Sequence, residues 1–559
     1  MQKRLWLASI PEDYDARKDI LLGPWCVLGK EHQYTDLSEL VFEPDPFTSA
    51  EDIIRTANLT AGFAEAYLVR LSTQLTNELN ASLTVKSWRF LLMPWLLPLV
   101  QITWMKQKLI NAVISKYRDD DISVELAEDS IEWEFVDTFD FVKATQSVCF
   151  NYWLLSRVLE GRAPDNWTIV YSKLRRPRTY SAAPPNSIKA KIVNIASRML
   201  PVSTVYGVNW LDALLLETVI RVKSLLMRRT NGNVTSRKDE NISLKWNLDW
   251  DTVVFNTLPK SLSNIRTNSN RLRRSRRLMV LSWSHVYYDD KVKKDIAILA
   301  GLGAKLIATQ HGGSYGTNSV HARPALIEYM NDAFFSWGWQ KTTYSGENIV
   351  PTPSPLLSKL CHKQTSNRII FVNGSMRVFP PRLESLPQPN QLIAARNSIV
   401  SFISMLDKKI LTDFWYRPFF GGAGQLLDEA FILKAVASIN ILKGKLHDES
   451  MKCKLLVLNA PDTTLNIALA ANIPTLCFWD PNSIGIDWNA KPYFAELKRV
   501  GIIYDGATEA SRRVNEIWDD VCGWWQQAAI QAARKEWAWQ YARTSKHWRR
   551  DWIELIWKL

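Results

Sequence analysis

Lys454-Leu-Leu-Val-Leu-Asn-Ala-Pro-Asp-Thr-Thr-Leu-Asn-Ile-Ala-Leu-Ala-Ala-Asn-Ile-Pro-Thr-Leu-Cys-Phe-Trp-Asp480 reads as a strand, a polar turn, a helix and a second strand. Leu455 to Leu458 is a continuous apolar run, as expected of a parallel strand that is covered on both faces. The Ala-rich stretch from Leu465 to Ala471 predicts the helix, and Ile473 to Phe478 predicts the next strand. A unit of this kind is half of a nucleotide-binding α/β domain.

The turn of this unit is a candidate phosphate-binding site. It places Asn459 and Asp462 just before a helix that starts at Thr463 and Thr464. The first turn of a helix has unpaired N–H groups and the positive end of the helix dipole, so it can hold a phosphate. The same side chains also suit ordinary capping of the helix by Asp462 or Thr463. Both interpretations stay open at this stage.

A second polar turn, Gln310-His311-Gly312-Gly313, follows the predicted strand from Ala304 to Thr309. Open α/β sheets place their ligands at this end of a strand. Glycine lets the backbone approach a substrate closely, and His311 could exchange a proton near neutral pH, with Gln310 beside it. The alternative is a tight turn that carries a structural histidine.

Three further polar residues are candidates for the same chemistry. Asp289 and Asp290 precede a predicted helix and are candidates for a catalytic base or nucleophile, although a helix cap and a first-turn acid are the favoured interpretation. Arg417 ends a predicted strand from Ile410 to Tyr416 and could pair with a phosphate or carboxylate. A surface ion pair is the alternative for Arg417.

Composition and charge restrict the class of protein. The 559 residues suggest about two to four domains, and 47% hydrophobic with 22% charged residues is typical of globular chains. A net charge of +13 predicts attraction to nucleic acid, anionic membranes or phosphorylated substrates. The six cysteines are dispersed without a CxxC pair, and the N-terminus lacks a signal-peptide pattern, so we expect a cytoplasmic protein without a zinc site.

Two stretches raise the question of a membrane. Phe90 to Trp104 is apolar but short and holds two prolines, which favours a buried helix. The C-terminal residues predict an amphipathic helix with Trp548 and Trp552 on its apolar face. Packing of that face against the body is favoured; the alternative is peripheral contact with anionic lipid, where a lipid-linked acceptor would be presented.

Changes in composition divide the chain. Residues 1–345 read as a Rossmann-like unit with a helical insertion, and residues 346–366, rich in Pro, Ser and Thr, read as a linker. Residues 367–520 read as a second Rossmann-like unit that binds the nucleotide. Residues 521–559 read as helices that pack back on the first unit.

The chain resembles the bacterial surface-polysaccharide transferases that are encoded in O-antigen regions. The resemblance spans nearly the whole chain and rests on these motifs: Gly23–Cys26, Trp88–Trp95, Thr309–Gly316, Phe335–Trp339, Ala468–Thr475, Phe478–Pro481, Pro492–Phe494, Val500–Ile502, Ile517–Val521 and Tyr541–Thr544. It implies an α/β, GT-B-like fold, in which two Rossmann-type domains face a cleft and C-terminal helices cross back. It also implies a glycosyltransferase with a nucleotide-sugar donor and a glycan or lipid-linked glycan acceptor.

A more distant similarity to capsule and lipopolysaccharide Kdo transferases implies a CMP-activated acidic sugar. The chain departs from the family pattern at Ile467, where a Glu that contacts the donor ribose is usual. No metal or other cofactor is expected, because the two Asp-x-Asp pairs, at Asp13 and Asp249, do not follow a clear strand. The alternatives are an inactive scaffold of the same shape, or a nucleic-acid-binding protein that uses the basic runs Lys173–Arg178 and Arg271–Arg277; no recognition motif accompanies these runs.

Overall fold

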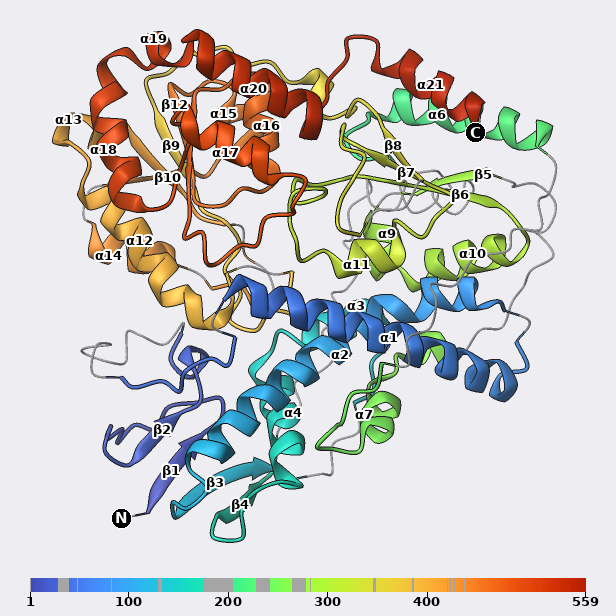
Figure 1. Ribbon diagram of the computed structural model, residues 1–559, viewed down its shortest axis with the longest axis vertical. Helices are drawn as coiled ribbons and strands as arrows, with labels where there is room; N and C mark the ends of the chain where they lie inside the picture. Colours follow the sequence, from blue (N-terminus) through green and yellow to red (C-terminus); the bar gives the residue numbers. More distant parts are fainter. Residues whose placement is uncertain are drawn as a thin grey trace.

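The computed structural model has an α/β architecture with three parallel sheets (Figure 1). It describes residues 2–28, 40–47, 49–81, 83–128, 133–174, 205–227, 242–263, 278–281, 283–344, 348–384, 387–419, 421, 424–426, 428–436 and 439–559. The α/β class expected from the sequence is confirmed.

The sheet of the C-terminal half has the strand order β11-β10-β9-β12-β13-β14, and all of its strand pairs are parallel. The strands are β9 (Ile369–Val372), β10 (Phe414–Arg417), β11 (Asn440–Ile441), β12 (Leu455–Leu458), β13 (Thr475–Phe478) and β14 (Ile503–Tyr504). In chain order this is the doubly wound 3-2-1-4-5-6 arrangement, which reverses direction between β9 and β12. The predicted unit from Lys454 to Asp480 forms β12, a turn, α16 and β13. Its strands are buried throughout, because helices cover both faces of the sheet.

The N-terminal half contains two separate sheets, although residues 1–345 read as one Rossmann-like unit. The first has the order β2-β1-β3-β4 and comprises β1 (Lys3–Trp6), β2 (Asp19–Leu21), β3 (Ile122–Ala127) and β4 (Thr168–Ser172). The second has the order β5-β6-β7-β8 and comprises β5 (Leu278–Leu281), β6 (Lys305–Thr309), β7 (Ala333–Ser336) and β8 (Ile349–Pro351). All of the pairs are parallel. Strand β8 lies within residues 346–366, which were predicted to be a linker. A strand can form there despite Pro351 because β8 is at the edge of the sheet, where a missing N–H is tolerated.

Two long helices separate these sheets. In Figure 1, α1 (Ala50–Glu78) and α2 (Val85–Lys116) cross the middle of the molecule, between β1–β4 and β5–β8. Residues 90–104 of α2 are buried at every position, so the interpretation as a buried helix is confirmed. Among the described residues, no helix is both long and apolar enough to cross a membrane.

The remaining helices cover the sheets. They are η1 (Pro24–Cys26), α3 (Thr138–Ala144), α4 (Val148–Glu160), α6 (Trp210–Leu226), α7 (Trp250–Thr257), α8 (Lys260–Ser263), α9 (Trp283–Tyr288), α10 (Asp290–Gly301), α11 (Ala322–Ile327), η4 (Leu357–Lys359), η5 (Pro389–Gln391), α12 (Leu392–Ser404), α13 (Lys408–Leu411), α14 (Glu429–Ala435), α15 (Leu446–Ser450), α16 (Thr463–Ala471), α17 (Lys491–Arg499), α18 (Ala507–Ile517), η6 (Trp518–Asp520), α19 (Val521–Trp525), α20 (Ala528–Tyr541) and α21 (Trp548–Lys558).

The C-terminal helix α21 crosses back to the N-terminal half, beside α6 (Figure 1). Its residues Trp548, Trp552 and Ile556 are buried in one cluster with residues of β5, β6 and β7. The Trp552 indole N–H also donates to the Pro353 carbonyl at 2.8 Å. The apolar face of this predicted helix therefore packs on the body, as favoured from the sequence.

Candidate functional site

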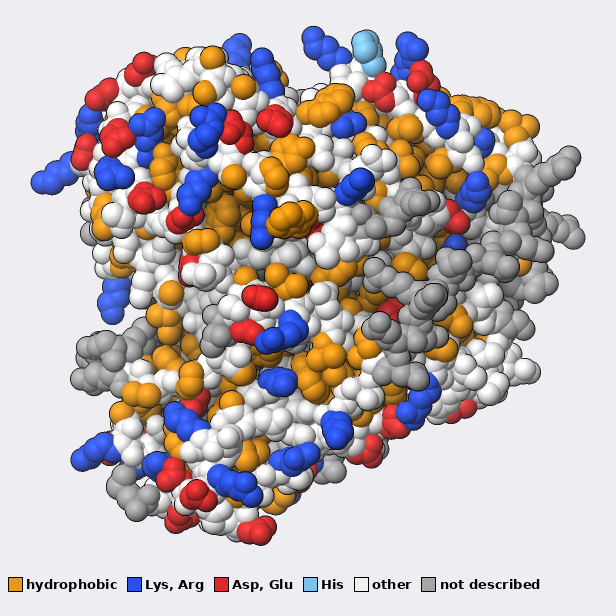
Figure 2. Space-filling model, viewed as in Figure 1, with side chains coloured by type: hydrophobic (Ala, Val, Ile, Leu, Met, Phe, Trp, Pro, Cys, Tyr) orange, Lys and Arg blue, Asp and Glu red, His pale blue; other side chains and the backbone are white. Residues whose placement is uncertain are grey.

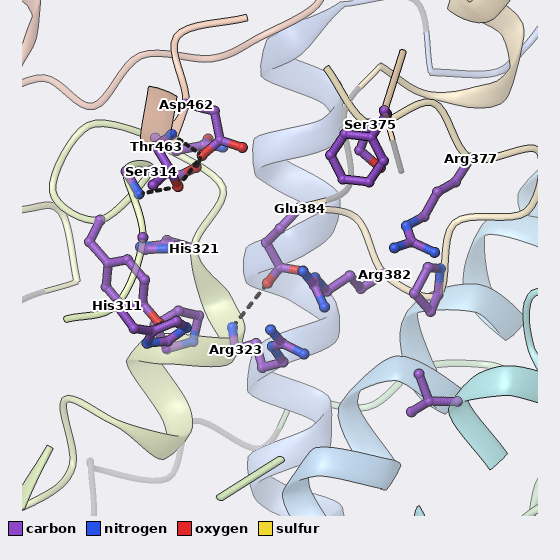
Figure 3. A pocket seen from close by; sticks show the side chains of 18 of the residues that line it. His311, Ser314, His321, Arg323, Ser375, Arg377, Arg382, Glu384, Asp462 and Thr463 are labelled. Atoms are coloured by element: carbon purple, nitrogen blue, oxygen red, sulfur yellow. Dashed lines mark hydrogen bonds and ion pairs between the residues drawn. The ribbon is translucent and has the colours of Figure 1, made fainter. Parts of the chain in front are cut away.

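The two polar turns singled out in the sequence meet at one cavity of about 410 Å³ between the two halves (Figure 3). The N-terminal half lines it with Val142, Gln146, Tyr206, Tyr288, His311, Gly312, Gly313, Ser314, Tyr315, Asn318, His321, Arg323 and Pro324. The C-terminal half lines it with Ser375, Arg377, Pro381, Arg382, Glu384, Pro387, Phe419, Asp462 and Thr463. The expected GT-B-like arrangement, two α/β halves that face a cleft, is thereby confirmed.

The turns touch each other directly at one side of this cavity. The Gly313 N–H donates to Thr463 Oγ1 at 2.9 Å, and the Ser314 hydroxyl donates to Asp462 Oδ1 at 3.2 Å. Asn466 of α16 donates its amide to the Gly313 carbonyl at 3.3 Å. A Cβ atom on Gly313 would lie 2.3 Å from the Thr463 backbone nitrogen, so this approach requires glycine.

Asp462 caps the N-terminus of α16 with its side chain. The Thr463 N–H donates to Asp462 Oδ1 at 2.7 Å, as in the capping interpretation. Thr463 and Asp462 both line the cavity, whereas Thr464 is not among the described lining residues. A phosphate contact at this helix end remains a prediction.

His311 lines the cavity and is nearly buried. Its ring lies edge-on to Tyr315, at 5.0 Å between centroids, and the Tyr315 hydroxyl oxygen is 3.1 Å from Nδ1. Burial, with added repulsion from Arg323, lowers the pKa of His311 well below its usual value. The imidazole is therefore neutral at neutral pH, and the same shift makes it a weaker base than an exposed histidine.

A buried carboxyl group supports this histidine. Tyr315 donates to Glu328 Oε1 at 2.6 Å, and Tyr287 donates to the same oxygen. Burial raises the pKa of Glu328 to about 7, although the two tyrosine hydroxyls partly offset the effect. The group Tyr287, Glu328, Tyr315 and His311 forms a continuous polar network beneath the cavity.

Three arginines give the cavity a positive charge. Arg323 comes from α11, and Arg377 and Arg382 come from the loop that follows β9. Glu384 faces this group: its Oε1 accepts the Arg323 backbone N–H at 2.9 Å, and its Oε2 lies 3.9 Å from Arg382 Nε (Figure 3). Guanidinium groups of this kind hold carboxylates and phosphates. None of the three was expected from the sequence. Arg377 and Arg382 follow the end of β9, which was a usable signal, whereas Arg323 on α11 carries none.

Tyr288 closes the arginine side of the cavity. Its hydroxyl accepts from Arg323 Nη1 at 3.1 Å. Burial raises the pKa of Tyr288, but the positive charges of Arg323 and Arg382 lower it by more, to about 7. The charge of these arginines is therefore large enough to favour an anion beside them.

A second cavity of about 250 Å³ lies at the point where the strand order reverses. It adjoins the ends of β9, β12 and β13, and it shares Ser375 and Pro387 with the first cavity. The candidate Asn459 lines it and joins the two central strands: its Oδ1 accepts the Gly374 N–H at 2.7 Å. Two further lining groups, Trp479 Nε1 and Asn390 Oδ1, are buried and have no hydrogen-bond partner among the residues that the structure describes. Such groups suit a polar ligand.

Three of the predicted catalytic residues lie outside the first cavity. Gln310 is buried under the turn, where its Oε1 accepts the N–H groups of Trp337 and of the Trp339 indole, so it is a structural residue. Asp289 caps α10, and Asp290 pairs with the buried Lys293 at 2.6 Å. The favoured interpretation of these two aspartates, as a cap and a first-turn acid, describes both.

One donor-site candidate, Arg417, also lies elsewhere. It donates to the Leu442 carbonyl at 2.9 Å and is not among the described residues that line either cavity. Ile467, which stands where the family usually has a ribose-binding Glu, is buried in the core. The basic run Arg271–Arg277, and Lys173–Arg178 beyond Leu174, lie outside the described residues.

Two solved structures are similar to the chain over most of its length. MurG of Acinetobacter baumannii is 12% identical, with a TM-score of 0.33 over 78% of this chain and 99% of that one. Arabidopsis thaliana UGT89C1, complexed with quercetin, is 8% identical, with a TM-score of 0.29 over 81% of this chain and 96% of that one. No curated protein matches the chain. The LIC12162 family transferase matches residues 3–556, so the chain belongs to this family and is a transferase.

Proposed function

We propose that this transferase moves a sugar from a nucleotide-sugar donor to a glycan acceptor. The observation that carries the proposal is the pair of connected cavities at the switch point between β9 and β12. Doubly wound sheets bind nucleotides at this position. The junction at Ser375 and Pro387 links a site of nucleoside size to the positively charged cavity that contains His311.

The second cavity suits the nucleoside of the donor. Trp479 offers an aromatic surface for a base, and the orphaned Asn390 Oδ1 offers an acceptor for a ribose hydroxyl or an exocyclic amine. Ser375 lies at the junction, where the phosphate of the bound nucleotide would be.

The first cavity suits an acidic sugar. Arg323, Arg377 and Arg382 bring three guanidinium groups to one cavity, whose lining also holds the carboxylates of Glu384 and Asp462. Three guanidinium groups can hold a sugar carboxylate as well as a phosphate, which favours a CMP-linked ulosonic acid such as Kdo. We therefore place the protein in the assembly of O-antigen or capsule polysaccharide, with a glycan or lipid-linked glycan acceptor at the inner face of the cytoplasmic membrane.

Transfer needs one proton acceptor and stabilisation of one leaving group. The acceptor hydroxyl oxygen forms a bond to the anomeric carbon while the bond from that carbon to the phosphate oxygen breaks. The neutral His311 imidazole takes the hydroxyl proton, and the arginines stabilise the charge that develops on the departing phosphate. The inactive-scaffold alternative predicts nucleotide binding without turnover.

Nucleotide binding is the first test. Thermal unfolding is measured with CMP, UDP and GDP for the wild type, for Trp479→Leu and for the control Trp539→Leu, an exposed tryptophan outside both cavities. A hundredfold excess over Kd stabilises by about 2.7 kcal/mol, which raises Tm by several degrees. We expect CMP to raise the Tm of the wild type and the control but not that of Trp479→Leu. No rise with any nucleotide, together with salt-dependent DNA binding, would favour the nucleic-acid alternative and overturn the proposal.

A further inference from the structure

Helix α6 presents an unusual outward surface. Its exposed positions are Trp210, Leu211, Leu214, Leu215, Thr218, Arg221, Val222, Leu225 and Leu226. The seven large apolar side chains among them form what we call the α6 face. Trp210 is 74% exposed, Leu225 72% and Leu226 68%. An apolar stripe on a surface helix normally faces the core, so this one requires an explanation.

The opposite side of α6 already performs the packing role. Leu216 and Ile220 are buried in one cluster with Trp552 of α21 and with β5. By contrast, the exposed positions of α18 are all polar: Thr508, Glu509, Arg512 and Glu516. Helix α6 is thus apolar on both sides. A helix with this pattern is normally covered on both sides when the protein functions.

The exposed charge on α6 itself is positive. The two acids of α6, Asp212 and Glu217, are buried and paired, Asp212 with Arg549 at 2.7 Å and Glu217 with Arg221 at 2.8 Å. No exposed residue of α6 is acidic, whereas Arg221 is exposed. On the neighbouring α21, the exposed Glu554 pairs with Arg550 at 2.7 Å, and Lys558 is exposed as well.

A second aromatic side chain extends this surface. Trp557 of α21 is 41% exposed, and the Lys223 ammonium lies 5.7 Å from its ring and donates to its carbonyl at 2.7 Å. Figure 2 shows hydrophobic side chains at the upper right, over α6 and α21, with Lys and Arg side chains and a few Asp and Glu side chains among them. Tryptophan and long cationic side chains at the edge of an apolar surface are typical of residues at a lipid–water boundary.

We propose that the α6 face binds the surface of an anionic membrane. The face lies on the outside of the molecule and has cations but no exposed acid on α6, which fits lipid headgroups with apolar chains beneath them. The net charge of +13 acts in the same direction. The inference rests on the proposed function only in that the membrane would supply a lipid-linked acceptor.

Vesicle flotation tests this inference without donor or acceptor, so its failure is distinct from a failure of sugar transfer. The full chain is mixed with vesicles of phosphatidylcholine alone or with phosphatidylglycerol added. We expect flotation with the anionic vesicles, weakened by salt. The variant Trp210→Ser/Leu214→Gln/Leu225→Gln/Leu226→Gln should bind these vesicles at least about tenfold more weakly than the wild type, because its apolar contacts are lost.

The control is Trp539→Ser on α20, which removes an equally exposed tryptophan and should float like the wild type. Unchanged thermal unfolding of both variants shows that the fold is intact. The proposal is overturned if the wild type does not float, or if the four-residue variant floats as well as the wild type. It is also overturned if sedimentation shows a dimer that this variant dissolves while vesicle binding is absent, because a second copy then covers the face.

Discussion

Gly313→Ala is expected to separate the two halves of the protein at the site. A Cβ atom at this position would lie 2.3 Å from the Thr463 nitrogen and 2.6 Å from its Cα, whereas ordinary contacts begin at 3.4 Å. The atoms in the way are backbone atoms on the other half, so a side-chain rotation cannot relieve the overlap. The Gly-Gly turn and the start of α16 must move apart by about 1 Å.

That displacement would break the contacts that join the two turns. The hydrogen bonds from Gly313 to Thr463, at 2.9 Å, and from Asn466 to Gly313, at 3.3 Å, would exceed the length of a hydrogen bond. Each is worth about 1 kcal/mol, and overpacking adds about 1–3 kcal/mol, so the closed arrangement loses about 3–5 kcal/mol. A misplacement of about 1 Å between reacting groups lowers turnover by about a hundredfold.

The assay is donor-dependent release of nucleotide, together with thermal unfolding. We expect kcat/KM to fall by about a hundredfold while Tm falls by only a few degrees, because the halves can move apart without unfolding. Gly312→Ala is a graded control, since its Cβ would meet only the Thr463 hydroxyl, at 3.3 Å; Gly506→Ala is a neutral one, with nothing within 4 Å. Turnover of Gly313→Ala within about twofold of the wild type would refute the reasoning, since the hundredfold loss requires the displacement.

Three further predictions concern the same cavity. Because the folded pKa of Glu328 is raised from 4.5 to about 7, its contribution to stability is complete below pH 4.5 and is lost as pH rises through 7. Glu328→Gln removes the titrating group, while its amide oxygen can still accept both tyrosine hydroxyls. The free energy of unfolding of this variant, from thermal unfolding at several pH values, should therefore lack up to about 3 kcal/mol of the change that the wild type shows between pH 4.5 and 7. Thr463→Val should lower turnover by about tenfold, since the Gly313 N–H loses its acceptor, whereas initial rates of Thr464→Val should match the wild type. Arg382→Gln should raise KM for a CMP-linked acidic sugar by about tenfold or more while CMP alone still raises Tm; equal losses for both ligands would contradict a carboxylate contact.

Local patterns were sufficient for both turns and for several strands, but not for every strand. Ile410 and Leu411 were expected at the start of a strand; they lie in α13 (Lys408–Leu411), and β10 begins at Phe414. The apolar run from Leu455 to Leu458 and the polar turn after it specify a buried parallel strand and its loop without reference to any other part of the chain. The meeting of this turn with the one at His311 was predictable too, since both follow the C-terminal ends of parallel strands. The division of the N-terminal half into two sheets was not, because strand pairing depends on contacts between distant segments.

The arginine cluster shows the same limit. Arg323 lies on α11 and Arg382 on a loop of the other half, so only the packed structure brings their charges together. The partners of Asp290 show the same limit: its carboxylate pairs with Lys293 and accepts from the Thr138 N–H and the Ser261 hydroxyl, and no local pattern connects these residues. A side chain at a strand end is thus a candidate only until its partners are known.

These contacts also decide where a negatively charged ligand would bind. The sequence left two interpretations of the start of α16 open, a phosphate site and a capped helix end. In the structure the Asp462 carboxylate caps the Thr463 N–H at 2.7 Å. A phosphate about 4 Å from that carboxylate would be repelled by about 4 kcal/mol at an effective dielectric constant of about 20, which exceeds the stabilisation of about 0.3–1 kcal/mol that a helix dipole usually supplies. On the other side of the same cavity, Arg323 and Arg382 attract the same charge. We infer that the arginines hold the anionic groups of the substrate and that the start of α16 serves to join the two halves.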